Sequence, residues 1–107
     1  MNNNRRKKVA AIIAALNKVK IESLAEVKDA VSDIASDIDD VCSEEEEAFD
    51  NFPESLRDTE RAEMMQECID NFYFAAESLE EAIEAESIEE AEEHIQEAIG
   101  ALEEIVI

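Results

Sequence analysis

The side chains of this sequence that are best suited to bind another molecule are its carboxylates. The 107 residues include 30 Asp or Glu against nine Lys or Arg, which gives a net charge of −21. The densest acidic group comprises Asp33, Asp37, Asp40, Glu44, Glu45, Glu46, Glu47 and Asp50. Carboxylates at helical spacing can engage the same Lys and Arg side chains that phosphates engage. The pattern predicts a surface for a basic protein partner, and the alternative is a solvated face that only maintains solubility.

The charge balance also excludes partners. A strongly negative protein repels nucleic acid and lipid headgroups, so we expect neither direct nucleic-acid binding nor membrane binding. No segment is apolar over the ~20 residues that a membrane span requires. The basic start of the chain is the exception, with Arg5, Arg6, Lys7 and Lys8 in sequence. This cluster either binds an anion such as a nucleotide or pairs within the fold with the acids between Glu81 and Glu104, and we favour the second interpretation.

Catalytic and metal-binding patterns are missing from the sequence. The single histidine, His94, has Glu90 and Glu97 within one turn, but the paired Glu-x-x-His of di-iron bundles needs a second histidine. No calcium loop, phosphate loop or nucleophile–base pair is present. We therefore expect a non-enzymatic protein with no metal and no cofactor, in which His94 is a surface residue among carboxylates.

Four less polar side chains are candidate contacts with another protein or another copy: Tyr73, Phe74, Cys42 and Phe49. Phe74 points away from the apolar seam by periodicity, so it either packs against a second protomer or anchors in a partner's pocket. Two cysteines in 107 residues fit reduced thiols in a cytosolic protein better than a disulfide scaffold.

The residues named above lie on two predicted helices, each with an apolar seam. In each seam, apolar residues recur at alternating intervals of three and four. The first runs from Leu24 to Val41 and the second from Ala62 to Ile83, and each occupies one face of a helix. Placed antiparallel, the seams face one another at positions whose numbers sum to 110. This register predicts an all-α, coiled-coil-like antiparallel helical hairpin in a single domain over residues 1–107.

The expected hairpin has a helix over about 5–50, a loop over 51–58 and a helix over about 59–106. Pro53 ends the first helix because proline disfavours helical backbone at the residue before it. Glu45 falls on the seam, so either the helices splay near the loop or Phe49 takes its place.

The three-four spacing of apolar residues is interrupted in both seams, at 19–24 in the first and at 83–88 in the second. We call these interruptions slips, and in the antiparallel alignment they lie opposite one another. This coincidence predicts a local unwinding, a kink or a break shared by the two helices. The capping-box pattern Ser87-Ile-Glu-Glu90 either starts a third helix or lies unused inside a continuous one.

The apolar face is wider than one partner helix can cover. The small or apolar residues that flank the seams are Ala35, Cys42, Phe49, Cys68, Ala75 and Ala82. Further helices come either from a second copy, giving a homodimeric four-helix bundle, or from the chain folding back at the slip level into a compact monomer. The homodimer is our preferred interpretation.

Charge is distributed unevenly along this hairpin. Residues 1–28 carry a net +5, whereas residues 29–80 carry 18 acids and two bases, a net −16. In the extended hairpin the basic N-terminus lies beside the C-terminal helix end. We therefore expect the uncompensated charge at the loop end, around Glu44–Glu47.

The segment EEEEAFDNFPESLRDTER, residues 44–61, followed by Met64 and Met65, resembles a group of small acidic helical proteins. That group is encoded by phages, prophages and mobile elements of Gram-positive gut bacteria, and its members carry a DNxPESL-type stretch before an acidic helix. The likeness covers about residues 40–85. The resemblance implies a phage-encoded accessory protein that acts in the cytoplasm of a bacterial host.

In that setting, the acidic surface predicts an inhibitor that mimics nucleic acid and blocks a nucleic-acid-binding defence protein of the host, such as a CRISPR effector or a restriction enzyme. One alternative is an oligomeric sponge that sequesters a signalling nucleotide on the basic N-terminal residues. Another is a structural or assembly protein of the virion.

Overall fold

The computed structural model of the chain describes residues 2–19, 23–56 and 59–106. These residues contain α-helices, one short 3-10 helix and no strand, which confirms the expected all-α class. The elements are α1 (Asn3–Asn17), α2 (Leu24–Asp50), η1 (Glu54–Leu56), α3 (Glu60–Ile83) and α4 (Ile88–Val106).

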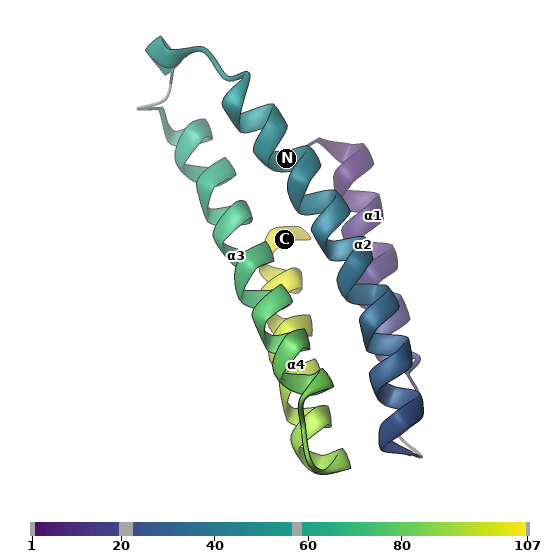
Figure 1. Cartoon of the computed structure of the whole chain (residues 1–107). Coiled ribbons are helices and arrows are strands. Elements are labelled where there is room, and N and C mark those ends of the chain that lie inside the picture. The colour runs from purple at the N-terminus through teal and green to yellow at the C-terminus, as the bar shows by residue number, and fades with distance from the viewer. Residues whose placement is uncertain (1, 20–22, 57–58, 107) are drawn as a thin grey trace.

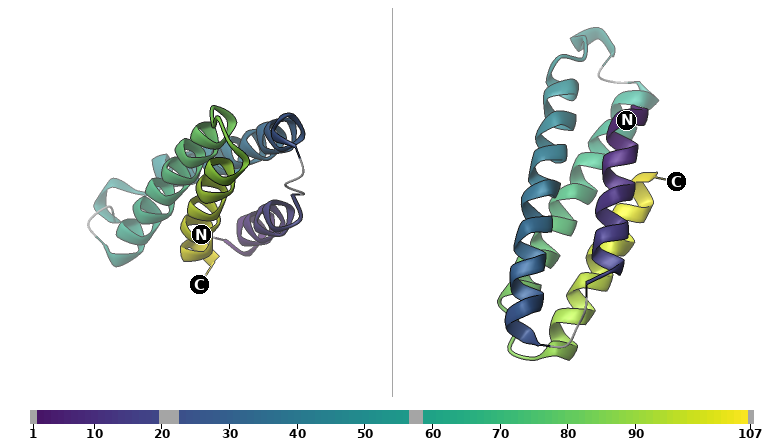
Figure 2. Two further views of the ribbon diagram at one scale, coloured as in Figure 1. Left: turned by 90° about the horizontal axis from the view of Figure 1, so that it is seen from below. Right: turned by 90° about the vertical axis from the view of Figure 1, so that its right-hand side faces the viewer.

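The α-helices pack as an antiparallel, up-and-down helical bundle (Figures 1 and 2). α1 packs against α2 and α4, and α3 packs against the same two helices, whereas α2 and α4 lie diagonally and touch little. The bundle is a rod of 50 × 21 × 20 Å. Short connections between neighbouring antiparallel helices are typical of this topology.

Polar side chains begin each α-helix by accepting a hydrogen bond from a backbone N–H three residues on, which satisfies a donor that has no partner within the helix. The caps are Asn2, Ser23, Thr59 and Ser87, bonded to the N–H groups of Arg5, Glu26, Ala62 and Glu90. The predicted capping box at Ser87 therefore does start a helix.

The expected continuous helix over 5–50 is wrong, because the chain reverses direction between α1 and α2. α1 ends at Asn17 and α2 begins at Leu24, and residues 20–22 lie outside the described part of the chain. The predicted break near 83–88 is confirmed, since α3 ends at Ile83 and α4 begins at Ile88. Both reversals lie at the same end of the bundle (Figure 1), as the matched slips predicted.

The core explains why the chain folds back. Its largest fully buried side chains include Ile38 on α2, Phe72 and Leu79 on α3, and Ile95 and Leu102 on α4. Burial of each such side chain contributes roughly 1.5–3 kcal/mol. Three of the six flanking residues that made the apolar face too wide for one helix lie in this same core, Cys42, Ala75 and Ala82, with Val9, Ile12 and Leu16 of α1 beside them. Ala35 and Cys68 are partly buried against it. Helices of one chain thus cover the wide face.

At the end opposite the reversals, α2 and α3 project beyond α1 and α4 (Figure 1). We call this two-helix projection, residues 46–56 and 59–63, the tip. The predicted loop over 51–58 contains η1, and its Arg57 and Asp58 lie outside the described residues. In the tip, the Arg61 guanidinium lies 6.0 Å from the centroid of the Phe52 ring, at the outer limit of a cation–π contact, and Leu56 is exposed.

Candidate partner-binding surface

The acidic residues predicted from sequence divide into exposed and buried groups. Those exposed on the outer faces of α2 are Asp33, Asp37, Asp40, Glu47 and Asp50. Glu44 and Glu46 are half-buried, and Glu45 is fully buried. Because an α-helix repeats every 3.6 residues, Asp33, Asp37, Asp40 and Glu47 lie on one face of α2. We call this row of carboxylates the α2 stripe. Glu45 instead points into the bundle.

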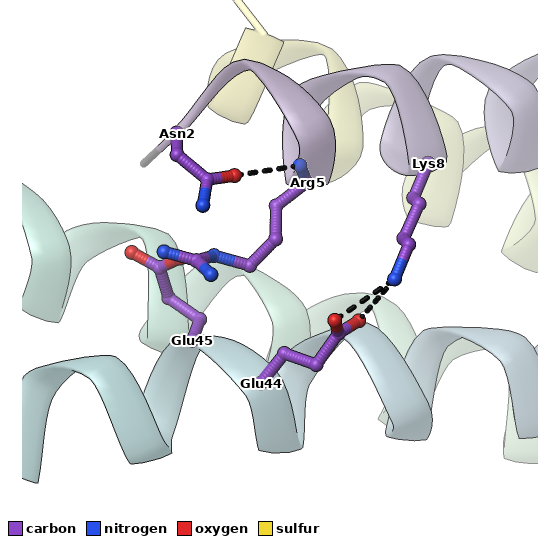
Figure 3. Close-up of polar contacts among 5 residues, drawn as sticks. All are labelled: Asn2, Arg5, Lys8, Glu44 and Glu45. Atoms are coloured by element: carbon purple, nitrogen blue, oxygen red, sulfur yellow. Dashed lines mark hydrogen bonds and ion pairs between the residues drawn. The ribbon is translucent and has the colours of Figure 1, made fainter.

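The basic N-terminus lies against this acidic segment, so the charge expected to be uncompensated at the loop end is offset at Glu44 and Glu45. Figure 3 shows Arg5 and Lys8 of α1 reaching Glu45 and Glu44 of α2. Arg5 Nε donates to Glu45 Oε2 over 2.6 Å, and Lys8 Nζ donates to both oxygens of Glu44 over 2.8 and 2.9 Å. The cause is the reversal after α1, which carries the basic start of the chain toward the loop end. Arg5 and Lys8 therefore pair within the fold, as favoured, but their partners are acids of α2 and not the expected acids between Glu81 and Glu104.

The two ion pairs differ in what they contribute. The side chains of Lys8 and Glu44 are 43% and 39% exposed, and an exposed pair contributes only about 0–1 kcal/mol. The side chains of Arg5 and Glu45 are 16% and 0% exposed. Removing one partner of a buried pair costs roughly 3–5 kcal/mol, since it leaves a buried charge uncompensated. Arg5 therefore fixes the position of α1.

Glu45 keeps its place on the apolar seam because of this pairing. The expectation that the helices splay, or that Phe49 replaces Glu45, is wrong: Glu45 is fully buried, Met65 is buried, and Phe49 is half-buried. The signal was present in the sequence as one acid on the seam and an N-terminal segment rich in bases. What the sequence did not show was that the two would meet.

A groove of 340 Å³ that the sequence did not predict runs between α1 and α2. Its apolar floor includes Ile12 and Val41, and the small side chains of Ala11 and Ala15 leave the space open. The full lining is Lys8, Ala11, Ile12, Ala15, Asp37, Asp40, Val41 and Glu44. Aliphatic stems of Lys and Arg bury well on apolar surface while their heads stay near charge. The groove can therefore receive a long basic side chain, with Asp37 and Asp40 at its rim.

Two of the candidate contact residues are engaged within the chain. Glu46 Oε1 accepts hydrogen bonds from the Tyr73 hydroxyl over 2.8 Å and from the Cys42 thiol over 3.3 Å. Burial, this bond and the neighbouring acids raise the pKa of Cys42 to about 12. The bond to Glu46 also raises the pKa of Tyr73. Cys42 is thus a buried, protonated thiol, and the hydrogen bond from Tyr73 to Glu46 joins α3 to α2.

Phe74 keeps the exposure that its periodicity predicts, with 52% of the side chain accessible. Met64, on the same helix, is 54% exposed. Cys42 and Cys68 are both free cysteines, as the sequence predicted. Arg6 and Lys7, the remaining members of the basic cluster, are exposed.

Comparisons with protein-family models, with curated proteins and with solved structures found no match to this chain. Among the described residues, no helix is both long and apolar enough to pass through a membrane. The site must therefore be interpreted from its own charge and geometry.

Proposed function

We propose that this chain is a non-enzymatic inhibitor that imitates the charge of duplex nucleic acid and occupies the basic groove of a nucleic-acid-binding protein. The observation that carries the proposal is linear charge density. A net charge of −21 over a rod 50 Å long is about one negative charge per 2.4 Å. Duplex DNA carries one per ~1.7 Å. The basic groove of a DNA-binding protein would therefore face a similar number of negative charges per unit length on this rod and on DNA.

The stripe along α2 is the surface that we assign to the partner. Asp33, Asp37, Asp40 and Glu47 are exposed and succeed one another by three, four or seven residues. At a rise of about 1.5 Å per residue, they span about 21 Å of helix. The groove beside Asp37 and Asp40 adds apolar contact for the stem of an inserted Lys or Arg.

The resemblance of residues 40–85 to phage-encoded acidic proteins supports the biological setting. In that setting the target is a DNA- or RNA-binding defence protein of the bacterial host, of the CRISPR-effector or restriction type, and the inhibitor acts in the cytoplasm. It binds neither nucleic acid nor membrane itself.

The nucleotide sponge is the weaker candidate. It depends on Arg5, Arg6, Lys7 and Lys8, and two of the four already hold carboxylates. An anion would have to displace Glu45 from Arg5 inside the bundle. Within residues 2–19, 23–56 and 59–106, no contact or cavity favours the virion-assembly alternative.

The test is competition between this protein and duplex DNA for a captured target. The protein is immobilised, exposed to extract of its bacterial host, and the captured protein is then titrated with labelled DNA. Binding should be mutually exclusive with DNA, and its affinity should fall steeply between about 50 and about 500 mM salt. Simultaneous binding of DNA, or affinity that does not change with salt, would refute mimicry.

A matched pair of variants separates the α2 stripe from total charge. Asp33→Asn/Asp37→Asn/Asp40→Asn should weaken target binding strongly. Glu89→Gln/Glu92→Gln/Glu93→Gln removes the same charge from exposed positions of α4 and should weaken it only slightly. Equal loss in both variants would show that the α2 stripe is not the contact surface.

For the oligomeric state, we propose that the monomer is the active form. The preference for a homodimer depended on an apolar face too wide for one partner helix. In the structure, α1 and α4 pack on that face. Met64, Tyr73 and Phe74 are the exposed large hydrophobic residues of α3 among the described residues, and they are the ones that a dimer could use. Sedimentation equilibrium that gives twice the 12.0 kDa chain mass would refute this proposal.

A further inference from the structure

His94 lies between two carboxylates that come from different helices. Its Nδ1 atom is 3.1 Å from Glu81 Oε2 of α3 and 3.3 Å from Glu97 Oε2 of α4. One ligand atom from each of the three residues can be chosen so that all lie within 4.8 Å of one another. The sequence pointed to Glu97 but not to Glu81, because only the reversal at 84–87 brings α3 and α4 together.

We propose that Glu81, His94 and Glu97 form a binding site for a divalent first-row transition-metal ion, with Zn²⁺ as the probe. Tetrahedral Zn²⁺ holds nitrogen and oxygen ligands at about 2.0–2.2 Å, which places neighbouring ligand atoms about 3.4 Å apart. The two observed separations from Nδ1 fit this geometry. Three protein ligands leave a fourth position for water.

The ligand types select the class of metal. A site with one imidazole nitrogen and two carboxylate oxygens suits Zn²⁺ and its first-row neighbours. Ca²⁺ prefers six to eight oxygen ligands, and Mg²⁺ prefers oxygen ligands in a near-ideal octahedron. Neither requirement is met by three ligands of which one is nitrogen.

The surrounding charge favours a cation at this position. The sequence contains no Lys or Arg after Arg61, so neither α4 nor the part of α3 that carries Glu81 supplies a fixed cation to these carboxylates. Glu90, one turn before His94, is not counted as a ligand, because its carboxylate accepts a hydrogen bond from the Glu86 N–H over 3.3 Å. The carboxylates of Glu81 and Glu97 lie against the His94 ring, and the charge of Glu90 adds to theirs, so the ring lies in a negative field. The same negative field attracts a metal ion.

A metal held here would join α3 to α4 near the reversal that connects them. Because the ligands come together only in the folded chain, the bound ion would stabilise the fold in proportion to its affinity. The site is independent of the α2 stripe, so the success or failure of nucleic-acid mimicry does not bear on it.

Calorimetric titration with Zn²⁺ and thermal unfolding test the proposal on the full chain. The wild type should bind one saturable equivalent in the presence of excess Mg²⁺ and unfold at a higher temperature with Zn²⁺ than without. His94→Gln should lose at least about 10–100-fold in affinity, the loss seen even for residues behind the ligands, and should lose the thermal shift. Circular dichroism confirms that the variant is folded.

Two further variants complete the test. Glu81→Gln should weaken binding like His94→Gln, since it removes the ligand from the second helix. Glu103→Gln removes an exposed acid of α4 that no contact ties to the site, and it should bind as the wild type does. Undiminished Zn²⁺ binding in His94→Gln, through thiols or scattered carboxylates, would overturn the proposal, and so would undiminished binding in Glu81→Gln.

Discussion

The N-terminal half of the chain, residues 1–56 with α1 and α2, handles its charge differently from the C-terminal half, residues 57–107 with α3 and α4. The first half has 13 acids and seven bases, a net −6, and the second has 17 acids and two bases, a net −15. In the first, Arg5 and Lys8 reach across helices to Glu45 and Glu44. In the second, among the described residues, the cross-helix ion pair is that of His94 with Glu81.

The Lys and Arg side chains of these cross-helix pairs, Arg5 and Lys8, both belong to α1, the α-helix with the fewest buried residues. α1 is the shortest α-helix and buries Val9, Ile12 and Leu16, whereas α4 buries seven residues. A buried ion pair adds a specific position and angle to the docking of α1. The α3–α4 pair is held by its apolar contacts and can leave its outer carboxylates in water.

Arg5→Ala is the substitution with the largest expected effect on this comparison. It leaves Glu45 charged and buried, so the free energy of unfolding should fall by roughly 3–5 kcal/mol. Urea denaturation followed by circular dichroism measures the change. The double variant Arg5→Leu/Glu45→Leu removes both charges and should recover most of the stability. A loss below about 1 kcal/mol in Arg5→Ala would mean that the pair does not hold α1.

Alkaline pH tests the burial of Cys42 and the acids around it in the N-terminal half. The thiol has a pKa of about 12 in the folded chain against 9.0 for an unperturbed cysteine. The protonated form is favoured by folding, so this contribution is complete below pH 9 and is lost as the pH rises from 9 toward 12. Wild type should therefore lose more stability over that range than Cys42→Ala. Parallel curves for the two proteins would contradict the shift.

Gly100→Ala tests the C-terminal half, where a gain is expected. Gly100 is exposed within α4, and a Cβ added there would meet nothing within 4 Å. Alanine in a helix interior is favoured over glycine by up to about 1 kcal/mol. The midpoint of urea unfolding should rise without a change in slope. A decrease in the midpoint would contradict the expectation that the helix accommodates the added methyl group without strain.

Lys8→Ala should have the smallest effect. Its pair with Glu44 is exposed on both sides, so the expected loss of stability is about 0–1 kcal/mol at most and should vanish in high salt. The same denaturation measurement, made at low and high salt, compares it with Arg5→Ala. Equal losses in the two variants would remove the distinction between the buried and the exposed pair.

The sequence predicted the helical class, both seams and the level of the two breaks. The apolar rhythm specifies which faces are buried, and it is the same whether a helix continues past a slip or folds back. Ser23 and Glu26 form an S-x-x-E pattern like that of Ser87 and Glu90, and the Ser23 cap would have marked the start of α2.

The candidate site was predicted only in part, because its geometry depends on the direction of α1. The acids of α2 were identified by spacing, but whether they are free in solvent depends on where Arg5 and Lys8 lie. The groove beside Asp37 and the approach of Glu81 to His94 likewise arise from the two reversals. Short-range patterns carry no information about such pairings between distant helices.

The tip has a consequence for local dynamics. Most residues there are exposed, so their amides should exchange with solvent at a lower opening free energy than those beside Phe72 or Leu102. The tip can therefore unfold and reform while the four-helix part remains intact. This end of the rod can adapt its shape to another molecule at little cost to the stability of the whole.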